Sequence, residues 1–177
     1  MDAVAYDAIV LTGGRGSRLG GADKAALSVG GLTLLERVLR AVSEAGRILN
    51  VGPQVSGGPV AAVANGLAQS DADVVVVLAC DLPFLTGTTV RRLVSAVGET
   101  DGAVLVDAGR RRQYLAAVYT RAALLDAVHR LPRTEGASMH DLVEGLRLTE
   151  VRSQSEEAAD CDTWADVARA RALLEER

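Results

Sequence analysis

The sequence predicts an α/β protein in which a mostly parallel β-sheet lies between two layers of helices. Short runs rich in β-branched residues alternate with longer segments whose apolar residues recur every three to four positions. Asp73–Ala79 is almost wholly apolar, which is typical of a central strand that helices cover on both faces. A chain of 177 residues, of which 49% are hydrophobic, can bury such a core, so we expect residues 1–177 to form a single domain.

Each element is placed from its local pattern. Three segments begin with Thr or Ser followed three residues later by Glu or Asp, which is the spacing of a helix-capping box. We expect strands at Tyr6–Thr12, Arg47–Val51, Asp73–Ala79, Ala103–Val106, Tyr114–Tyr119 and Leu148–Arg152. We expect helices at Thr33–Ala45, Val60–Ala68, Thr86–Val97, Arg121–Leu131, Ser138–Leu146 and Thr163–Glu176.

Composition excludes several classes of protein. A net charge of −4 and 3% aromatic residues disfavour a nucleic-acid partner, which needs a basic surface and stacking side chains. The apolar runs are shorter than the ~18 residues that span a bilayer, and Met1–Ala8 lacks the basic start of a secretory signal. Two cysteines, Cys80 and Cys161, are too few for a disulfide framework. We therefore expect a cytoplasmic protein without a membrane partner.

The loop after the first strand is the first candidate site, because open α/β sheets bind ligands beyond the carboxyl ends of their strands. Residues 11–24 contain five glycines, two arginines and Lys24, which is the single lysine of the chain. Closely approaching backbone amides and positive charges suit a polyphosphate. The spacing matches neither the dinucleotide fingerprint nor the Walker A motif. The candidate residues are Leu11, Thr12, Gly13, Gly14, Gly16, Ser17, Arg18 and Lys24.

Two carboxylates are candidate ligands for Mg²⁺, which prefers one or two carboxylates together with phosphate oxygens. Asp81 follows the buried strand Asp73–Ala79 and so lies at the same edge of the predicted sheet. In Asp160-Cys161-Asp162 an extended backbone points the two aspartates to one side and Cys161 to the other. The alternative for Asp81 is a turn or helix-capping role; for Asp162 it is a cap of the last helix, and for Asp160 a plain surface position.

Residues 11–27, LTGGRGSRLGGADKAAL, resemble the signature of the MobA-type nucleotidyltransferases, the molybdenum cofactor guanylyltransferases. Further matches are the blocks at residues 57–62, 79–85 and 160–163, so the resemblance covers nearly the whole chain. It implies a three-layer α/β/α Rossmann-like fold of the nucleotide-diphospho-sugar transferase type. It also implies Mg²⁺-dependent transfer of GMP from GTP to the terminal phosphate of molybdopterin with release of pyrophosphate, in molybdenum cofactor biosynthesis.

The resemblance assigns roles residue by residue. Asp81 and Asp162 would hold the metal, with Asp160 as an alternative ligand, while Lys24 and Arg18 would stabilise the phosphates. Gly58 and Pro59 match nucleotide-binding positions, and Asn50 matches another in one of two registers. Arg112 lies in a basic turn that aligns near the acceptor pocket, although such turns are more often simply solvated. Other molybdenum cofactor assembly proteins are the implied partners.

The sequence also departs from the family. Only Gln54–Ser56 separate two glycine-proline turns, where relatives carry a longer segment with an Asp that contacts the nucleotide. Gly13-Gly14 favours GTP, whereas the Asp-x-Asp-Thr segment at 160–163 is more frequent among CTP-using relatives. Three hypotheses stay open: a guanylyltransferase, a molybdopterin cytidylyltransferase or other nucleotidyltransferase, and a catalytically silent nucleotide-binding partner in cofactor assembly.

Overall fold

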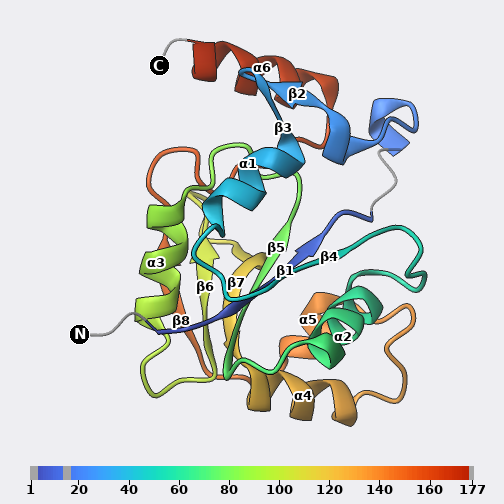
Figure 1. Cartoon of the computed structure of the whole chain (residues 1–177), viewed down its shortest axis with the longest axis vertical. Helices are drawn as coiled ribbons and strands as arrows, with labels where there is room; N and C mark the ends of the chain where they lie inside the picture. The colour runs from blue at the N-terminus through green and yellow to red at the C-terminus, as the bar shows by residue number, and fades with distance from the viewer. Residues whose placement is uncertain (1–3, 14–16, 176–177) are drawn as a thin grey trace.

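The main sheet has six strands in the order β4-β1-β5-β7-β6-β8, as a computed structural model describing residues 4–13 and 17–175 shows (Figure 1). Within this sheet β7 runs antiparallel to its neighbours β5 and β6, and the other five strands are parallel. This confirms the predicted mostly parallel sheet. The strands are β1 (Asp7–Leu11), β4 (Ile48–Val51), β5 (Val74–Ala79), β6 (Gly102–Val106), β7 (Arg112–Thr120) and β8 (Leu148–Arg152).

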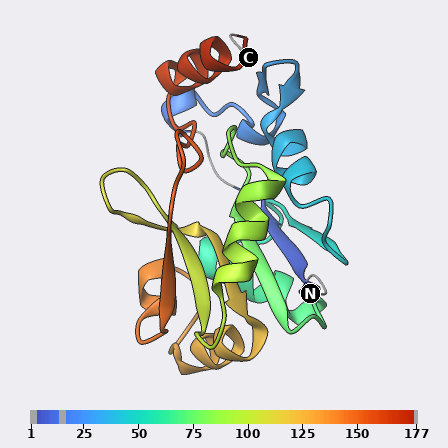
Figure 2. The same ribbon diagram turned by 90° about the vertical axis from the view of Figure 1, so that its left-hand side faces the viewer.

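Helices cover both faces of the sheet. One buried cluster joins α1 and α3 to one face, and a second joins α2, α4 and α5 to the other. α6 lies apart from both faces, beyond the carboxyl ends of the parallel strands (Figures 1 and 2). The helices are α1 (Leu34–Ala41), α2 (Pro59–Gln69), α3 (Gly87–Ala96), α4 (Arg121–Arg130), α5 (Met139–Val143) and α6 (Trp164–Glu175).

The central strands bury both of their faces. Along β1, Ala8 and Val10 enter the cluster beneath α1 and α3, whereas Ile9 and Leu11 enter the cluster beneath α2. β5 divides its side chains between the two clusters in the same alternating way. Since successive side chains of a strand point to opposite faces, an unbroken apolar run fits a position with helices on both sides. The central placement predicted for residues 73–79 is confirmed.

The predicted helix caps form. Thr33 accepts a hydrogen bond from the Glu36 amide at 3.1 Å, and the Glu36 carboxylate accepts one from the Thr33 amide at 2.7 Å. The same reciprocal pair joins Ser138 to Asp141 at the start of α5. Such boxes satisfy backbone amides that a helix start leaves without partners, and so they fix where the helix begins.

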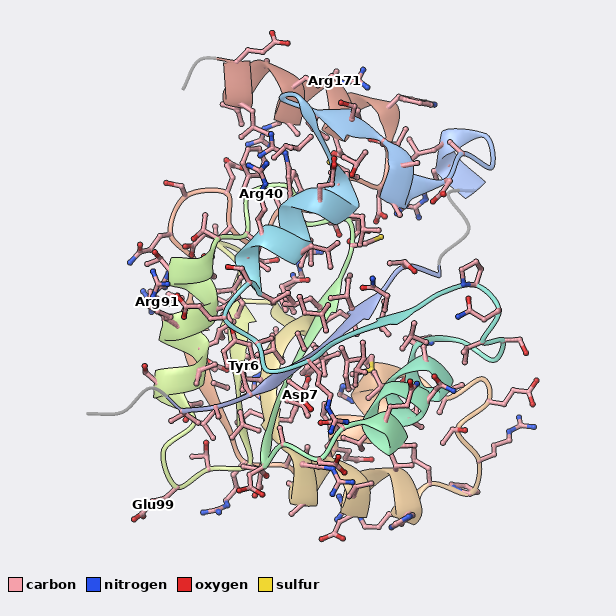
Figure 3. All side chains as sticks on the ribbon, viewed as in Figure 1. Tyr6, Asp7, Arg40, Arg91, Glu99 and Arg171 are labelled. Carbon is pink, nitrogen blue, oxygen red and sulfur yellow. The ribbon has the colours of Figure 1, made fainter. Side chains whose placement is uncertain are left out.

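A small lobe stands above the carboxyl edge of the sheet; we call residues 17–33 together with α6 the edge lobe (Figure 1). It contains two 3-10 turns, Ser17–Leu19 and Lys24–Ala26, and a hairpin of β2 (Ser28–Val29) with β3 (Leu32–Thr33). The Arg171 side chain of α6 donates a hydrogen bond to the Ser28 carbonyl at 3.0 Å, so the two distant segments are joined (Figure 3).

The hairpin turn requires glycine at position 30. Gly30 and Gly31 both have positive φ, 58° and 80°, the backbone conformation of a two-residue type I′ turn. A Cβ on Gly30 would lie 2.6 Å from the Arg37 guanidinium and 2.9 Å from Leu174 of α6. Side chains of α1 and α6 therefore occupy the space that a side chain at position 30 would need.

None of the helices in residues 4–13 and 17–175 is long and apolar enough to cross a membrane.

Candidate active site at the carboxyl edge of the sheet

The loops after β1, β4 and β5 leave the sheet side by side. Leu11 of β1 pairs with Val51 of β4 on one side and with Ala79 of β5 on the other. Beyond the strands, the Thr12 amide donates to the Val51 carbonyl at 2.9 Å, and the Cys80 amide donates to the Leu11 carbonyl at 3.1 Å. The predicted first loop and the segment that carries Asp81 therefore start as immediate neighbours.

Gly13 lies where two of these loops touch. A Cβ at Gly13 would stand 3.2 Å from the backbone of Gly52 and of Pro53, which is tighter than ordinary van der Waals contact. Glycine at this position thus has a packing reason, independent of any nucleotide. Gly14 and Gly16 lie outside the described residues, and Ser17 begins the first 3-10 turn.

The start of α2 faces the same edge. Gly58 is the N-cap residue, with φ 90°, and Pro59 occupies the first helical position. Proline fits there because its fixed φ is helical and its missing N–H has no partner in the first turn. The free amides and the dipole of a helix start attract anions, so the predicted pair Gly58 and Pro59 lies at an end of α2 suited to phosphate. The shortened segment before it folds as a turn, in which the Val55 amide donates to the Gly52 carbonyl at 3.1 Å.

Lys24, Asp81 and Asp162 converge although 138 positions separate the first from the last. The Lys24 ammonium lies 3.2 Å from Oδ2 of Asp81 and also donates to Oδ1 of Asp162. The side chains of Lys24 and Asp81 are 14% and 18% exposed, and that of Asp162 is 42% exposed. Asp23 positions Lys24, because its carboxylate caps the 3-10 turn by accepting from the Ala25 amide at 3.0 Å. The three charges form a half-buried cluster with one side open to solvent.

Burial and charge act against each other within this cluster. Burial disfavours the Lys24 ammonium, but the hydrogen bond to Asp162 and the charge of Asp81 outweigh it and raise the lysine pKa. Burial also raises the pKa of Asp81, and the charge and hydrogen bond of Lys24 offset part of that rise. For Asp160, partial burial followed by the negative charges of Asp162 and Asp81 raises the pKa. Among the described residues, carboxylates thus gather here around the Lys24 ammonium.

Backbone contacts bring Asp162 to this place. The Cys161 amide donates to the Asp81 carbonyl at 3.0 Å, which ties the segment before α6 directly to the loop after β5. Cys161 is 1% exposed, so its side chain points into the protein while Asp162 stays accessible, as the predicted alternation requires. Burial raises the pKa of Cys161 and of Cys80 to about 12, so both thiols stay protonated at neutral pH. Both cysteines are free and buried.

Asp166 completes the support of Asp162. Its carboxylate accepts hydrogen bonds from the backbone amides of Asp162 at 3.1 Å and Thr163 at 2.8 Å. The Thr163 hydroxyl in turn accepts from the Asp166 amide at 3.2 Å, so the predicted capping box forms at the start of α6. Thr163 and Asp166 cap the helix, which leaves the side chain of Asp162 free to contact Lys24.

Three further candidates form no hydrogen bond or ion pair with the Lys24 cluster in the described structure. Arg18 is exposed in the first 3-10 turn, and Asn50 is exposed on the edge strand β4. Arg112 stands at the start of β7, at the same edge of the sheet but two strands from β1, where it forms an ion pair of 2.8 Å with Glu150 of β8. The structure does not bring Arg112 to the Lys24 cluster. Sequence reasoning placed Lys24 and both aspartates at one edge but did not foresee their direct ion pairs.

The donor set fits a divalent metal ion that also binds phosphate. Asp81 and Asp162 direct carboxylate oxygens toward one point, which the Lys24 ammonium contacts. Mg²⁺ commonly uses one or two carboxylates and takes its remaining ligands from phosphate and water. Among the described residues, no group of three or more His, Cys, Asp or Glu side chains is placed to hold a metal ion by itself.

The helices on both faces and the order of the strands define a nucleotide-diphospho-sugar transferase-type fold. It superposes with a TM-score of 0.77 on molybdopterin-guanine dinucleotide biosynthesis protein A from Archaeoglobus fulgidus, at 20% identity over 97% of this chain and 100% of that one. It superposes with a TM-score of 0.74 on 2-C-methyl-D-erythritol 4-phosphate cytidylyltransferase from Thermus thermophilus, at 23% identity over 98% and 100% of the two chains.

The chain belongs to the family of MobA-like NTP transferase domains, whose model matches residues 8–151. A Mycobacterium ulcerans relative named "Probable molybdenum cofactor guanylyltransferase" is 31% identical over 94% of this chain and 93% of its own length. A molybdenum cofactor guanylyltransferase of Cupriavidus metallidurans is 33% identical over 59% of this chain, and the match spans 63% of that relative. The resemblance of residues 11–27 to the MobA-type signature is confirmed at the level of the family.

Proposed function

We propose that the protein transfers GMP from GTP to the terminal phosphate of molybdopterin and releases pyrophosphate. The observation that carries this proposal is the convergence of Lys24, Asp81 and Asp162 beyond the carboxyl ends of β1 and β5. A cation between two carboxylates suits a metal-bound triphosphate, and the start of α2, which follows the neighbouring strand β4, offers free amides to its phosphates. The names of the two relatives support guanylyl transfer in particular.

The chain's own groups would hold the nucleotide at this edge. The Thr12 amide is already bonded to the Val51 carbonyl, so the backbone at Gly13 and the first turn of α2 would offer the amides that bind phosphate oxygens. Lys24 and Arg18 would stabilise the oxygens of the α- and β-phosphates as charge moves onto the leaving group. Lys24 would then exchange its carboxylate contacts for phosphate contacts.

Asp81 and Asp162 would hold Mg²⁺. When bound, this ion would supply positive charge to the α-phosphate and the acceptor oxygen, and so stabilise the transition state of the displacement. Asp160 lies in the same segment as Asp162 and would serve as an alternative metal ligand. Its pKa is raised by burial and by the neighbouring carboxylates.

The reaction needs no general base. An oxygen of the acceptor phosphate, already anionic near neutral pH, would form the new bond to the α-phosphorus. The bond from that phosphorus to the oxygen bridging the α- and β-phosphates breaks, and pyrophosphate leaves with the electron pair. His129 and His140 are both exposed, on α4 and α5, and the proposed mechanism gives neither a role.

The test is pyrophosphate release from each of the four ribonucleoside triphosphates, with and without molybdopterin and Mg²⁺. Release that requires GTP, molybdopterin and Mg²⁺ together is the expected result. Binding of Mg·GTP, seen as thermal stabilisation, without any release would contradict catalysis and favour the silent nucleotide-binding partner.

A CTP-dependent transfer is the second candidate. The Asp160-Cys161-Asp162-Thr163 segment favours it, and the similar fold of the Thermus cytidylyltransferase fits it equally well. The packing of Gly13 against Gly52 and Pro53 also gives the first glycine of the pair a role that does not depend on the base. Calorimetric titration with GTP and with CTP would separate the two: binding at least tenfold tighter for CTP would replace the guanylyl assignment.

A further inference from the structure

The connector between β8 and α6, residues 153–163, runs from the sheet to α6 (Figure 2) and carries Asp162 to the site. One of its glutamates fixes it to the neighbouring helix α3. Glu157 in this connector accepts hydrogen bonds from Thr89 Oγ1 of α3 at 2.8 Å and from the Gln154 amide at 2.7 Å. Arg92 of α3 donates to both of its carboxylate oxygens, at 3.0 and 2.9 Å. The Glu157 side chain is 12% exposed, so this contact is largely sheltered from solvent.

The same threonine belongs to the other half of the site. Thr89 forms the capping box of α3 with Thr86: its hydroxyl accepts from the Thr86 amide at 3.4 Å and lies 3.0 Å from the Thr86 hydroxyl. Thr86 ends the loop that begins at Asp81, since α3 starts at the next residue. One side chain, Thr89, therefore contacts both the loop of Asp81 and the connector of Asp162.

Further contacts hold the connector on both sides of Glu157. Arg92 also donates to the Arg152 carbonyl at 2.6 Å, where β8 ends. Toward α6, the Cys161 amide donates to the Asp81 carbonyl at 3.0 Å. Between them, Ala158 is 8% exposed and packs into the cluster under α1 and α3. Contacts with residues near the start of α3 thus fix the position of the connector on its way to Asp162.

We propose that Glu157 is a positioning residue: by fixing the connector to Thr89 and Arg92 it sets the distance between Asp162 and Asp81. Hydrogen bonds to an ionised carboxylate are shorter and stronger than neutral ones, and a buried one is poorly replaced by water. Groups that orient ligand side chains from outside the site tune ligand binding in this way. The inference concerns the geometry of the site and rests on the proposed function only in its kinetic test.

The chain offers a reporter of this geometry that needs neither metal nor substrate. Lys24 is the single lysine, so its side chain gives one ¹³Cε–¹⁵Nζ signal in a uniformly labelled protein. That signal depends on the two carboxylates around the ammonium. An Asp162→Asn variant marks the position of the signal when one carboxylate is lost.

The first variant is Glu157→Gln, which keeps the size of the side chain but removes its charge and replaces one acceptor oxygen by an NH2 group that cannot accept from the donors around it. The matched control is Glu44→Gln, because Glu44 forms an ion pair of 2.7 Å with Arg91 of the same helix, which Figure 3 labels, and no hydrogen bond or ion pair in the described structure joins Glu44 to the connector. We expect Glu157→Gln to move the Lys24 signal toward the Asp162→Asn position, and Glu44→Gln to leave it in place. A wild-type Lys24 signal in folded Glu157→Gln protein would overturn the proposal.

A second pair of variants keeps the test decisive if Glu157→Gln does not fold. Thr89→Val removes the hydroxyl donor at nearly constant volume, and Thr89→Ser restores it. We expect Thr89→Val to move the Lys24 signal and Thr89→Ser to return it. If both variants give the same signal, the contact between Thr89 and Glu157 does not position Asp162, and the proposal is wrong.

The kinetic test separates positioning from plain stability. In Glu157→Gln the Mg²⁺ concentration for half-maximal rate should rise about tenfold, the lower end of the effect expected for an outer-shell partner. The KM for the nucleotide should change less than twofold. A fall in melting temperature with an unchanged Mg²⁺ requirement would show a structural role alone. If the wild-type protein transfers no nucleotide, the proposed function fails, and the Lys24 signal still decides the role of Glu157.

Discussion

The body of the sheet and the edge lobe are stabilised differently. In the body, two large apolar clusters on either face of the sheet hold helices that lie next to their strands along the chain. The edge lobe shares a small cluster of seven buried residues with α1, the connector before α6 and the loop after β5, and hydrogen bonds from Arg37 and Arg171 to the hairpin add to it. The body supplies a rigid frame, whereas the lobe brings Lys24 close to Asp162, 138 positions away. The candidate site thus lies at the junction between the body and the edge lobe, where few side chains connect the two parts.

The largest expected effect is on catalysis at this junction. Lys24→Ala and Asp81→Asn should each lower the rate of nucleotidyl transfer about a thousandfold, the upper range for losing one preorganised charge in an active site. Far-UV circular dichroism should show an intact fold. Asp71→Asn is the matched control, because Asp71 is 81% exposed and pairs with Arg47 away from the site. Transfer at the wild-type rate by Asp81→Asn protein would remove the metal-binding assignment.

The next effect compares the two cores. Leu67→Ala in α2 should lower the free energy of unfolding by about 2–5 kcal/mol, because the buried side chain leaves a cavity in the rigid body. Val167→Ala in α6 removes less apolar surface and should cost about 2 kcal/mol. Native-state hydrogen exchange would distinguish them. We expect Val167→Ala to speed exchange mainly in α6; faster exchange throughout the sheet would show that lobe and body unfold as one unit.

A smaller effect concerns the cap of α6. Thr163→Ala removes the hydroxyl of the capping box and should lower stability by about 1 kcal/mol in chemical denaturation. Hydrogen bonds from the Thr163 side chain, and from the Thr163 and Asp162 amides, hold the pKa of Asp166 below its usual value. A lowered carboxyl pKa stabilises the fold above the unfolded-state pKa, and this stability is lost as pH falls through the folded-state pKa.

The dependence of protein stability on acidic pH therefore tests the role of Asp166 in this cap. Between neutral pH and the acid transition, an Asp166→Asn variant should lose less stability than the wild-type protein does. Parallel stability curves for the two proteins would contradict the role of the Asp166 charge.

The smallest effect is expected in the β6–β7 turn. Arg112→Ala breaks an exposed ion pair with Glu150, and such pairs contribute about 0–1 kcal/mol to stability. Because Arg112 lies away from the Lys24 cluster, the KM for the nucleotide should stay within twofold of wild type. The KM for molybdopterin tests the remaining hypothesis for this arginine: a tenfold rise would assign it to the acceptor, and no change would leave it as a solvated turn residue.

The body of the fold could be predicted from the sequence because its signals are local. Apolar runs, 3.6-residue periodicity and capping boxes placed all six strands of the main sheet and all six α-helices within a few residues. Leu148–Arg152 agrees at both ends with β8. The antiparallel direction of β7 was not predicted. The short turn after β6 makes a hairpin possible, but the alternation of apolar and polar residues along a strand does not fix the direction of that strand.

The edge lobe was predicted less well. The β2–β3 hairpin and the 3-10 turns were missed, because two-residue strands give almost no periodic pattern. Gly30-Gly31 between Val29 and Leu32 was the available signal, since adjacent glycines commonly form a two-residue hairpin turn. The docking of α6 on this hairpin depends on contacts across the whole chain, which one sequence does not show.

The charged residues of the candidate site could be identified from the sequence, but the contacts between them could not. Lys24 and Asp81 follow neighbouring strands of the sheet, so topology alone brings them to one edge. Asp162 arrives through the Cys161 amide and the contacts of Glu157 with Thr89 and Arg92, which no local spacing encodes. The metal, the nucleotide and the roles of individual residues stay predictions.

The pairing of the β2–β3 hairpin with α6 has a consequence for biosynthesis. Ribosomes make the chain from its amino end, so the hairpin and Lys24 are made well before Asp162 and α6. Until that later segment emerges, the hairpin lacks the helix that covers it, and the triad of charges lacks its third member. In a nascent chain the site is therefore incomplete until residues far along the sequence have left the ribosome.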